Sequence, residues 1–232
     1  MRRTSMQLAA AVLVSGLAVA ACGSLQLGAA AVTGQGRITS AALANQVASL
    51  NTAYQADKRK GVKPQRTTGQ EPQQVLTWLL TFQIFNKLAA QHGISVSSPQ
   101  VQRQLAGLQA QAAQEKVSTK IYVSAAGAVP PDLVSQIGRY FAILQLFENK
   151  LDGGKQPTAQ AAQAALQARL AHAQCLAAKD LSINVNPQYG EYDYSTFSVV
   201  PAQSKLAAAP SVSAKPSPSA SPTAKPLLTP PC

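Results

Sequence analysis

Apolar side chains recur every three or four residues through most of this chain, and this spacing constrains the fold more than any other feature. On an α-helix such residues form one stripe that must be buried against a partner. Five segments show the pattern, and a loop or turn separates each from the next. They cover roughly residues 39–60, 72–92, 98–112, 130–152 and 158–178. The sequence therefore predicts a mainly α-helical domain.

Residues typical of helix ends stand at the borders of these segments. Thr39 or Ser40 can cap the first helix, and Pro72 suits the first turn of the second. Gly93 is expected to end the second helix. The third helix is predicted to have Ser98 as its N-cap, with Pro99 in its first position.

Only three short segments have the composition of strands, residues 30–33, 182–185 and 196–200. A stretch that begins Asn186-Pro187 separates the last two, and these residues favour a turn. If the first segment pairs with the last two, a small antiparallel sheet joins the N- and C-terminal ends of the domain.

The end of the chain differs from the rest. From Ala207 onward the residues are mostly Ala, Pro, Ser, Thr and Lys, without apolar periodicity. Such a segment cannot bury enough apolar surface to offset the entropy of ordering it. Residues 203–232 are therefore predicted to form a disordered Pro/Ala/Ser-rich tail.

The start of the chain has the three parts of an export signal. It begins Met1-Arg2-Arg3, continues into an apolar run over residues 8–21, and reaches Val-Ala-Ala-Cys at residues 19–22. The run of about 14 residues is shorter than the roughly 20 that span a bilayer core. Residues 1–21 are therefore predicted to be a removable signal peptide.

The junction Val-Ala-Ala-Cys resembles the lipobox of bacterial lipoproteins. The resemblance implies that the Cys22 thiol receives a diacylglycerol before cleavage, and that the new amine is often acylated with a chain such as palmitate. Two or three acyl chains anchor a protein far more firmly than one. We therefore expect a lipid-anchored protein on the outer, extracytoplasmic face of the cell membrane. An ordinary secretory signal with a chance cysteine is the alternative.

The positive charge of the chain does not indicate a nucleic-acid partner. The formal net charge is +11, and loss of Arg2 and Arg3 with the leader leaves +9 (11 minus 2). An exported protein on the outer face of a membrane does not meet nucleic acid. Anionic lipid headgroups and acidic wall polymers are the expected counter-ions. The dense basic run at residues 58–60 is interpreted as a solvated loop.

Two short motifs lie in residues 30–108, among segments ordered as strand, helix, loop, aromatic-rich helix and helix. Residues 32–39 read Val-Thr-Gly-Gln-Gly-Arg-Ile-Thr, and residues 92–97 read His-Gly-Ile-Ser-Val-Ser. This stretch resembles the N-terminal domain of the SurA chaperone family, which includes PrsA-like and trigger-factor-like foldases. Together with the lipobox, residues 180–201 resemble SurA-N-like lipoproteins of high-GC Gram-positive bacteria.

Many members of that family insert a parvulin isomerase domain after the early helices. Here residues 156–201 read as one helix and a hairpin, which leaves no room for such a domain. The resemblance therefore implies that residues 22–202 form a SurA-N-like helical domain that holds unfolded or exported polypeptides. No isomerase or other enzymatic activity is expected.

Candidates for catalysis or metal binding are few. Glu191 and Asp193 alternate along an extended segment, but solubility of a hairpin accounts for them, and Ser195 has no histidine nearby in the sequence. His92 and His172 are far apart, and His92 suits a helix end. We therefore expect no catalytic residue, no metal site and no cofactor.

The candidate client-binding surface consists of apolar side chains on the second and fourth predicted helices. They are more numerous than one narrow helical stripe requires, although an ordinary core is the alternative interpretation. The set is Trp78, Phe82, Phe85, Tyr140, Phe141, Leu144 and Phe147.

If Cys22 carries lipid, Cys175 and Cys232 remain for sulfur chemistry. In an oxidising compartment they can form a disulfide, which would close a loop of 57 residues (232 minus 175). Alternatively, Cys175 is a small buried hydrophobe and Cys232 is free for intermolecular pairing.

The leading functional hypothesis is a lipid-anchored chaperone-like protein that holds non-native exported polypeptides by apolar contact. The alternative is a structural or assembly lipoprotein that docks one folded partner at the cell envelope, through the same surface or through the tail. An enzyme of the foldase group is the third and weakest hypothesis.

Overall fold

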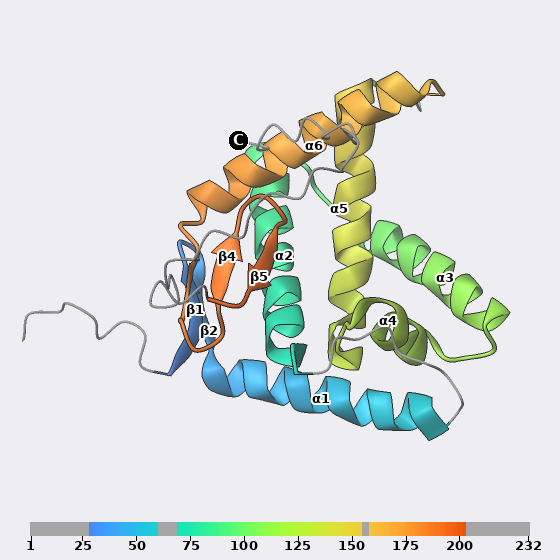
Figure 1. The fold of residues 1–232 in the computed structure, drawn as a ribbon. Helices are drawn as coiled ribbons and strands as arrows, with labels where there is room; N and C mark the ends of the chain where they lie inside the picture. Colours follow the sequence, from blue (N-terminus) through green and yellow to red (C-terminus); the bar gives the residue numbers. More distant parts are fainter. Residues whose placement is uncertain (1–27, 60–68, 155–157, 203–232) are drawn as a thin grey trace, which may run out of the picture.

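The computed structural model describes residues 28–59, 69–154 and 158–202. Within these ranges the chain is mainly helical with small antiparallel strands, which confirms the predicted fold class (Figure 1). The predicted signal peptide, Cys22, Lys60 and the predicted tail lie outside the described residues. The interpretation of the basic run as a loop was wrong for Lys58 and Arg59, because both belong to the last turn of α1. The helices are α1 (Ser40–Arg59), α2 (Glu71–Gln91), α3 (Ser98–Gln114), α4 (Thr119–Gly127), α5 (Val134–Asp152) and α6 (Gln160–Asp180). The strands are β1 (Ala29–Thr33), β2 (Gly36–Thr39), β3 (Asn184–Val185), β4 (Glu191–Asp193) and β5 (Ser198–Val200).

Five of these helices match the five predicted segments, whereas α4 was not predicted. Its β-branched residues Ile121 and Val123 favour strands in isolation, and both are buried in the folded chain. The side chain of Ser118 caps the helix by accepting a hydrogen bond from the Ile121 N–H at 3.4 Å. Packing against α1 and α3 therefore outweighs the local preference.

The helix caps agree with the prediction at α1 and differ by one residue at α3. Thr39 caps α1, because its hydroxyl accepts a hydrogen bond from the Ala42 N–H at 3.0 Å. The N-cap of α3 is Ser97, so the prediction of Ser98 was wrong. Gln100 completes a capping box, since its side chain accepts a hydrogen bond from the Ser97 N–H at 2.7 Å.

The strands form two small sheets instead of the one predicted. β1 lies between β2 and β3 in a three-stranded antiparallel sheet. The pairing of β1 with β3 confirms that the two ends of the domain meet. The predicted pairing of β1 with the last strand was wrong, because β5 pairs with β4 alone. The N–H of Val199 in β5 instead donates to the Thr77 hydroxyl of α2 at 2.9 Å, so α2 lies along the outer edge of β5.

Helix α2 is the centre of the molecule. In Figure 1 it runs beside α5, with α1 below the pair, α6 across the top and the strands on one side. One core cluster joins β1 and α1 to the first half of α2. A second cluster joins the second half of α2 to α5 and α6, and a third joins α2 to α4 and α5. Each fully buried Leu, Ile or Phe in these clusters contributes about 1.5–3 kcal/mol.

Helix α3 packs closely on α5 at Gly138. A methyl group at this position would stand 2.7 Å from Leu105 Cγ and 3.2 Å from Val101 Cγ1, so no larger residue fits without movement. The Nε2 of Gln104 also donates a hydrogen bond to Gln145 Oε1 at 2.8 Å. These contacts fix α3 against the side of α5.

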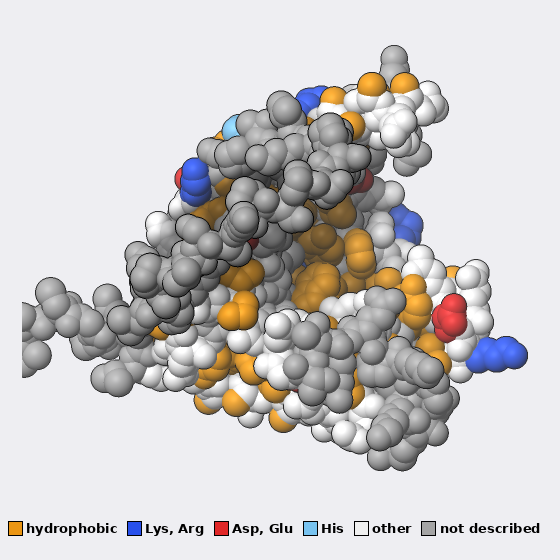
Figure 2. Space-filling model, viewed as in Figure 1, with side chains coloured by type: hydrophobic (Ala, Val, Ile, Leu, Met, Phe, Trp, Pro, Cys, Tyr) orange, Lys and Arg blue, Asp and Glu red, His pale blue; other side chains and the backbone are white. Residues whose placement is uncertain are grey.

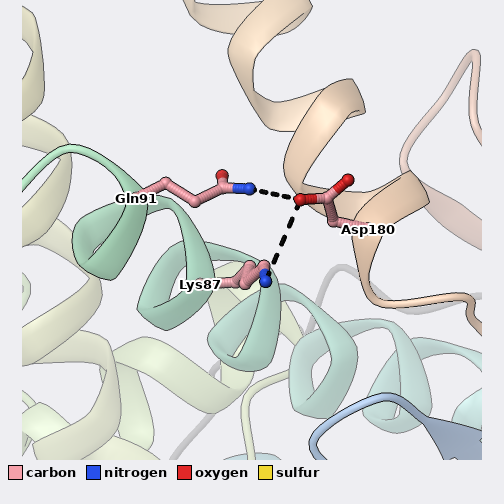
Figure 3. Close-up of polar contacts among 3 residues, drawn as sticks. All are labelled: Lys87, Gln91 and Asp180. Atoms are coloured by element: carbon pink, nitrogen blue, oxygen red, sulfur yellow. Dashed lines mark hydrogen bonds and ion pairs between the residues drawn. The ribbon is translucent and has the colours of Figure 1, made fainter.

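The end of α6 is fastened to the last turns of α2 by Asp180 (Figure 3). Its Oδ2 accepts a hydrogen bond from Gln91 Nε2 at 2.6 Å and lies 3.9 Å from Lys87 Nζ. A carboxylate at a helix C-terminus is unfavourable in the helix dipole, and the Lys87 ammonium offsets this. Exposed ion pairs stabilise little, so the contact mainly fixes how α6 crosses α2.

Candidate functional site

The aromatic side chains predicted to bind clients form one row between α2 and α5. The Trp78 ring lies 5.8 Å from Phe82 and 6.0 Å from Tyr140, centroid to centroid. The Tyr140 ring lies 4.6 Å from Phe85 and 5.0 Å from Phe141. Tilted and edge-to-face pairs at these distances are favourable for aromatic rings. Tyr140 therefore joins the two helices, and its burial raises the pKa of its hydroxyl group.

Burial divides the seven predicted residues into two groups. Three are core residues and do not form a surface, because they are 5%, 2% and 1% exposed: Phe82, Phe85 and Phe147. The other four are half-buried and remain accessible from outside: Trp78, Tyr140, Phe141 and Leu144. We call these four residues the apolar face. The candidate client-binding surface therefore contains four of the seven residues predicted from the sequence.

The molecule is hollowed where α2 and α5 reach its surface. Figure 2 shows the hollow between α3 and the strands β4 and β5, with hydrophobic side chains gathered in its floor. Each end of the apolar face borders a groove. Phe141 and Leu144 line the first groove, and Trp78 lines the second.

The first groove lies between α3, α5 and α6 and has a volume of about 390 Å³; we call it the amide groove. Its apolar lining is Phe141, Leu144 and Leu166. Five side-chain amides surround this lining, together with the carboxylates of Glu148 and Asp152: Gln104, Gln145, Asn149, Gln163 and Gln167. The sequence analysis missed these amides, although four glutamines spaced along three predicted helices are visible in the sequence.

The two carboxylates give this groove an acidic side. Glu148 lies one helical turn before Asp152 on α5. Burial raises the pKa of the Glu148 carboxyl, and the negative charge of Asp152 raises it further. No Lys or Arg is among the described residues that line this groove.

The second groove lies between the start of α2, the end of α4 and β5 and has a volume of about 480 Å³; we call it the strand groove. Trp78 is held in its wall, because its Nε1 donates a hydrogen bond to the Gly127 carbonyl at 2.7 Å. Gln73 and Gln74 also line it, and their buried Oε1 atoms accept no hydrogen bond from any residue that the structure describes. Buried acceptors without a donor are unfavourable, so these two atoms lower the stability of the fold.

A third groove, of about 780 Å³, lies away from the apolar face between α6 and the ends of α2 and α5; we call it the α6 groove. Leu176 on its edge is 47% exposed, and no other large hydrophobic side chain in the described ranges is exposed. His92 and His172, far apart in sequence, both line this groove. No group of three potential metal ligands exists among the residues described. His92 is the C-cap of α2, and its ring lies 4.7 Å from that of Phe147.

Of the two hairpin carboxylates, Asp193 is held by hydrogen bonds within the turn. Asp193 accepts hydrogen bonds from the Ser195 N–H at 2.8 Å, the Ser195 hydroxyl at 2.7 Å and the Thr196 hydroxyl at 2.9 Å. These bonds, chiefly those from Ser195, lower the pKa of the Asp193 carboxyl. A carboxylate of lowered pKa is a weaker proton acceptor, and its hydrogen bonds to Ser195 and Thr196 stabilise the turn.

Of the three cysteines, Cys175 lies within the described residues. It is 1% exposed and disulfide-bonded, and its partner lies outside the part of the chain described here. No helix in the described ranges has both the length and the apolar character needed to cross a bilayer.

Comparison of the chain with protein-family models, with curated proteins and with solved structures finds no match.

Proposed function

We propose that this protein is a lipid-anchored, extracytoplasmic holding protein that binds non-native segments of exported polypeptides. One observation carries the proposal: the apolar face borders a groove lined by glutamine side chains at each end, the strand groove at Trp78 and the amide groove at Phe141 and Leu144. The apolar face supplies contact area for hydrophobic side chains of a client.

The amides suit a ligand without a fixed sequence. A non-native segment presents backbone N–H and C=O groups at every residue, and each needs a partner when it leaves water. A glutamine side chain both donates and accepts, so it can pair with either group.

The proposal also covers where the protein is located in the cell. The junction at residues 19–22 supports lipid attachment at Cys22, and the resemblance of residues 30–108 to SurA-like foldases supports a chaperone role. A holding protein fixed at the membrane surface would meet exported chains before they fold.

The test is suppression of aggregation of two unrelated denatured clients, followed by light scattering. We expect the wild-type protein to suppress it, and Phe141→Ser and Leu144→Ser each to weaken suppression at least about threefold with little change in melting temperature. Both side chains are half-buried, so the cost in stability stays well below the roughly 3–5 kcal/mol of a core aromatic.

Two control variants complete the test. Ile143→Val changes a side chain of the same helix that is 1% exposed, and it should cost about 0.5–1.5 kcal/mol of stability without affecting suppression. Leu176→Ser removes an exposed apolar side chain outside the apolar face and should also leave suppression unchanged. Wild-type suppression by both Phe141→Ser and Leu144→Ser would contradict the proposal. Absence of suppression by the wild type would favour the alternative of docking to one folded partner.

A further inference from the structure

The α6 groove is mainly apolar along its floor. This floor comes from Phe147 and Leu151 of α5 and from Ala173 and Leu176 of α6. Leu176 is 47% exposed, so the apolar surface of the groove is open to a ligand. Exposed apolar surface rimmed by polar side chains is typical of a binding groove. The volume of about 780 Å³ lies within the roughly 300–1,000 Å³ of small-molecule sites.

Cationic groups outnumber carboxylates around this groove. Arg169 lines it and is exposed. Lys150 reaches its edge, because its Nζ donates a hydrogen bond to the carbonyl of the lining residue His92 at 2.6 Å. Asp180 is the one carboxylate among the described lining residues, and it already lies 3.9 Å from Lys87 Nζ (Figure 3). With neutral histidines, three cations and one carboxylate leave a net charge of +2 (3 minus 1).

Arg169 and His172 are placed to receive one anionic group together. They are three residues apart on α6 and both line the groove, so their side chains lie on the same side of the helix. A guanidinium group offers a carboxylate two parallel N–H donors, and the imidazole adds another donor. Asp180 is eleven residues, or about 16 Å along the helix axis, from Arg169 and does not compete for it.

The length of the groove suits one acyl chain. The lining residues of α6 extend from Ala168 to Asp180. At 1.5 Å per residue, these 12 steps span about 18 Å. The hydrocarbon core of a bilayer is two acyl chains thick and measures about 30 Å, so one chain is about 15 Å long. A chain that starts at Arg169 therefore runs over Ala173 and Leu176 to the end of the groove.

We infer that the α6 groove binds a fatty acid, with its carboxylate at Arg169 and His172 and its acyl chain over Leu176. The positive charge selects the anionic head group, and the apolar floor selects the chain. This site goes beyond the proposed holding function. None of the four residues of the apolar face is among the described residues that line the α6 groove.

The first experiment measures how myristate displaces a dansyl-labelled undecanoic acid. The mature chain, residues 22–232, is secreted with a signal peptide that directs no lipid attachment, so no detergent competes for the groove. All ligands are kept below the concentrations at which they form micelles. We expect myristate to displace the probe, and myristyl alcohol, which has the same chain without the charge, to do so at least tenfold more weakly. Butyrate, which has the charge but a short chain, should not displace it.

Two variants separate the head-group contact from the chain contact. Arg169→Gln should weaken myristate binding at least fivefold and leave the affinity for myristyl alcohol unchanged. Leu176→Ser should weaken both ligands at least threefold. Both side chains are exposed, so the melting temperature should stay close to that of the wild type. Arg103→Gln changes an exposed arginine of α3 that is not among the lining residues, and this matched control should bind myristate like the wild type.

The second experiment locates the bound chain by photo-crosslinking. A myristate analogue with a diazirine at the end remote from its carboxylate is bound and irradiated, and the protein is then reduced and digested with trypsin. Cleavage after Arg169 and Lys179 releases the peptide 170–179, which carries Ala173 and Leu176. The part of α6 that lines the amide groove falls in the peptide 156–169. We expect the label in the peptide 170–179.

Several results would overturn the inference. They are absence of displacement by myristate, equal affinity for myristate and its alcohol, and label confined to the peptide 156–169. Wild-type affinity of Arg169→Gln for myristate, or of Leu176→Ser for either ligand, would do the same. Binding to vesicles of anionic phospholipid without binding of monomeric myristate would also overturn it, because the groove would then meet a membrane surface. Phe141→Ser should bind myristate normally, so failure of this inference is distinguishable from failure of the holding function.

Discussion

At the scale of single residues, the carboxylate of Asp193 shows how charge maintains the β4–β5 hairpin. It accepts three hydrogen bonds from the two residues Ser195 and Thr196. An ionised carboxylate accepts such bonds better than a protonated one, and this lowers the pKa of Asp193. The hairpin therefore depends on the ionised form.

The first prediction follows from the direction of that shift. A carboxyl whose pKa is lower in the folded state stabilises folding above its unfolded pKa of about 3.9, and this stabilisation is lost as the pH falls through the folded pKa. We expect the amide signals of Ser195 and Thr196 to shift, and their hydrogen exchange to accelerate, below about pH 4. In Asp193→Asn both effects should be absent. Wild-type pH dependence in that variant would contradict the assignment to Asp193.

Glu148 in the amide groove provides the second prediction, with the opposite sign. Its pKa is raised, so the folded state binds the proton more tightly than the unfolded state, and stability falls as the pH rises through the raised pKa. Glu148→Gln should therefore raise the melting temperature slightly at pH 7, by an amount equivalent to less than about 0.5 kcal/mol, because the site is partly exposed.

The gain from Glu148→Gln should disappear below about pH 4, where the wild-type carboxyl is also neutral. Glu191→Gln, at an exposed carboxylate in β4, is the control and should show no such dependence. A stability difference for Glu148→Gln that is independent of pH would contradict the electrostatic cause.

At the scale of secondary-structure elements, the contact between α3 and α5 depends on the missing side chain of Gly138. The third prediction is that Gly138→Ala destabilises the protein. Alanine favours a helix over glycine by about 1 kcal/mol, but a methyl group 2.7 Å from Leu105 overpacks the contact at a cost of about 1–3 kcal/mol. The net loss in the free energy of unfolding should be up to about 2 kcal/mol, measured by urea denaturation.

Gly107 in α3 is the matched control. Apart from the backbone of its own helix, no atom of the described residues lies within 4 Å of the place where its Cβ would stand. Gly107→Ala should therefore gain about 0.5–1 kcal/mol from helix preference alone. Equal changes in the free energy of unfolding for the two substitutions would show that a methyl group at Gly138 does not overpack the contact between α3 and α5.

The elements predicted well from the sequence are the helices in which the apolar stripe and the residues typical of helix ends indicate the same boundaries. α2 and α5 combine an apolar repeat with clear ends at Pro72 and Gly153, so both were found within a few residues. α4 lacks a long stripe, and only tertiary packing makes it a helix. β5 is separate from β1 because the Val199 N–H donates a hydrogen bond to the Thr77 hydroxyl. These two residues are 122 positions apart in the sequence, so no local sequence pattern reveals their contact.

The candidate site was only partly predictable, for a related reason. Sequence identified the apolar residues of α2 and α5, but periodicity cannot tell a core aromatic such as Phe85 from a half-buried one such as Phe141. The difference arises from what α3, α4 and α6 cover. The glutamines of the amide groove are visible in the sequence, yet they come together only when α3 and α6 pack beside α5.

At the scale of the whole molecule, the fourth prediction concerns the anchor. Cys22→Ala should abolish labelling of the protein by a fatty-acid analogue and release it from the membrane fraction or leave its leader uncleaved, because the lipid-bearing sulfur is gone. Cys175→Ser, which removes a cysteine of the folded domain, is the control and should be labelled normally. Wild-type labelling of Cys22→Ala would contradict the lipid assignment.

The β1–β3 pairing has a consequence for the order in which the protein becomes complete. The side-chain amide of Asn186 donates a hydrogen bond to the Ala29 carbonyl, 157 residues earlier. At a synthesis rate of 5–20 residues per second, about 8–30 s pass between the appearance of these two residues. During that interval β1 has β2 as a neighbour but lacks β3 on its other edge. The protein proposed to hold unfinished chains is thus itself an unfinished chain, with an open strand edge, until nearly all of its domain has emerged.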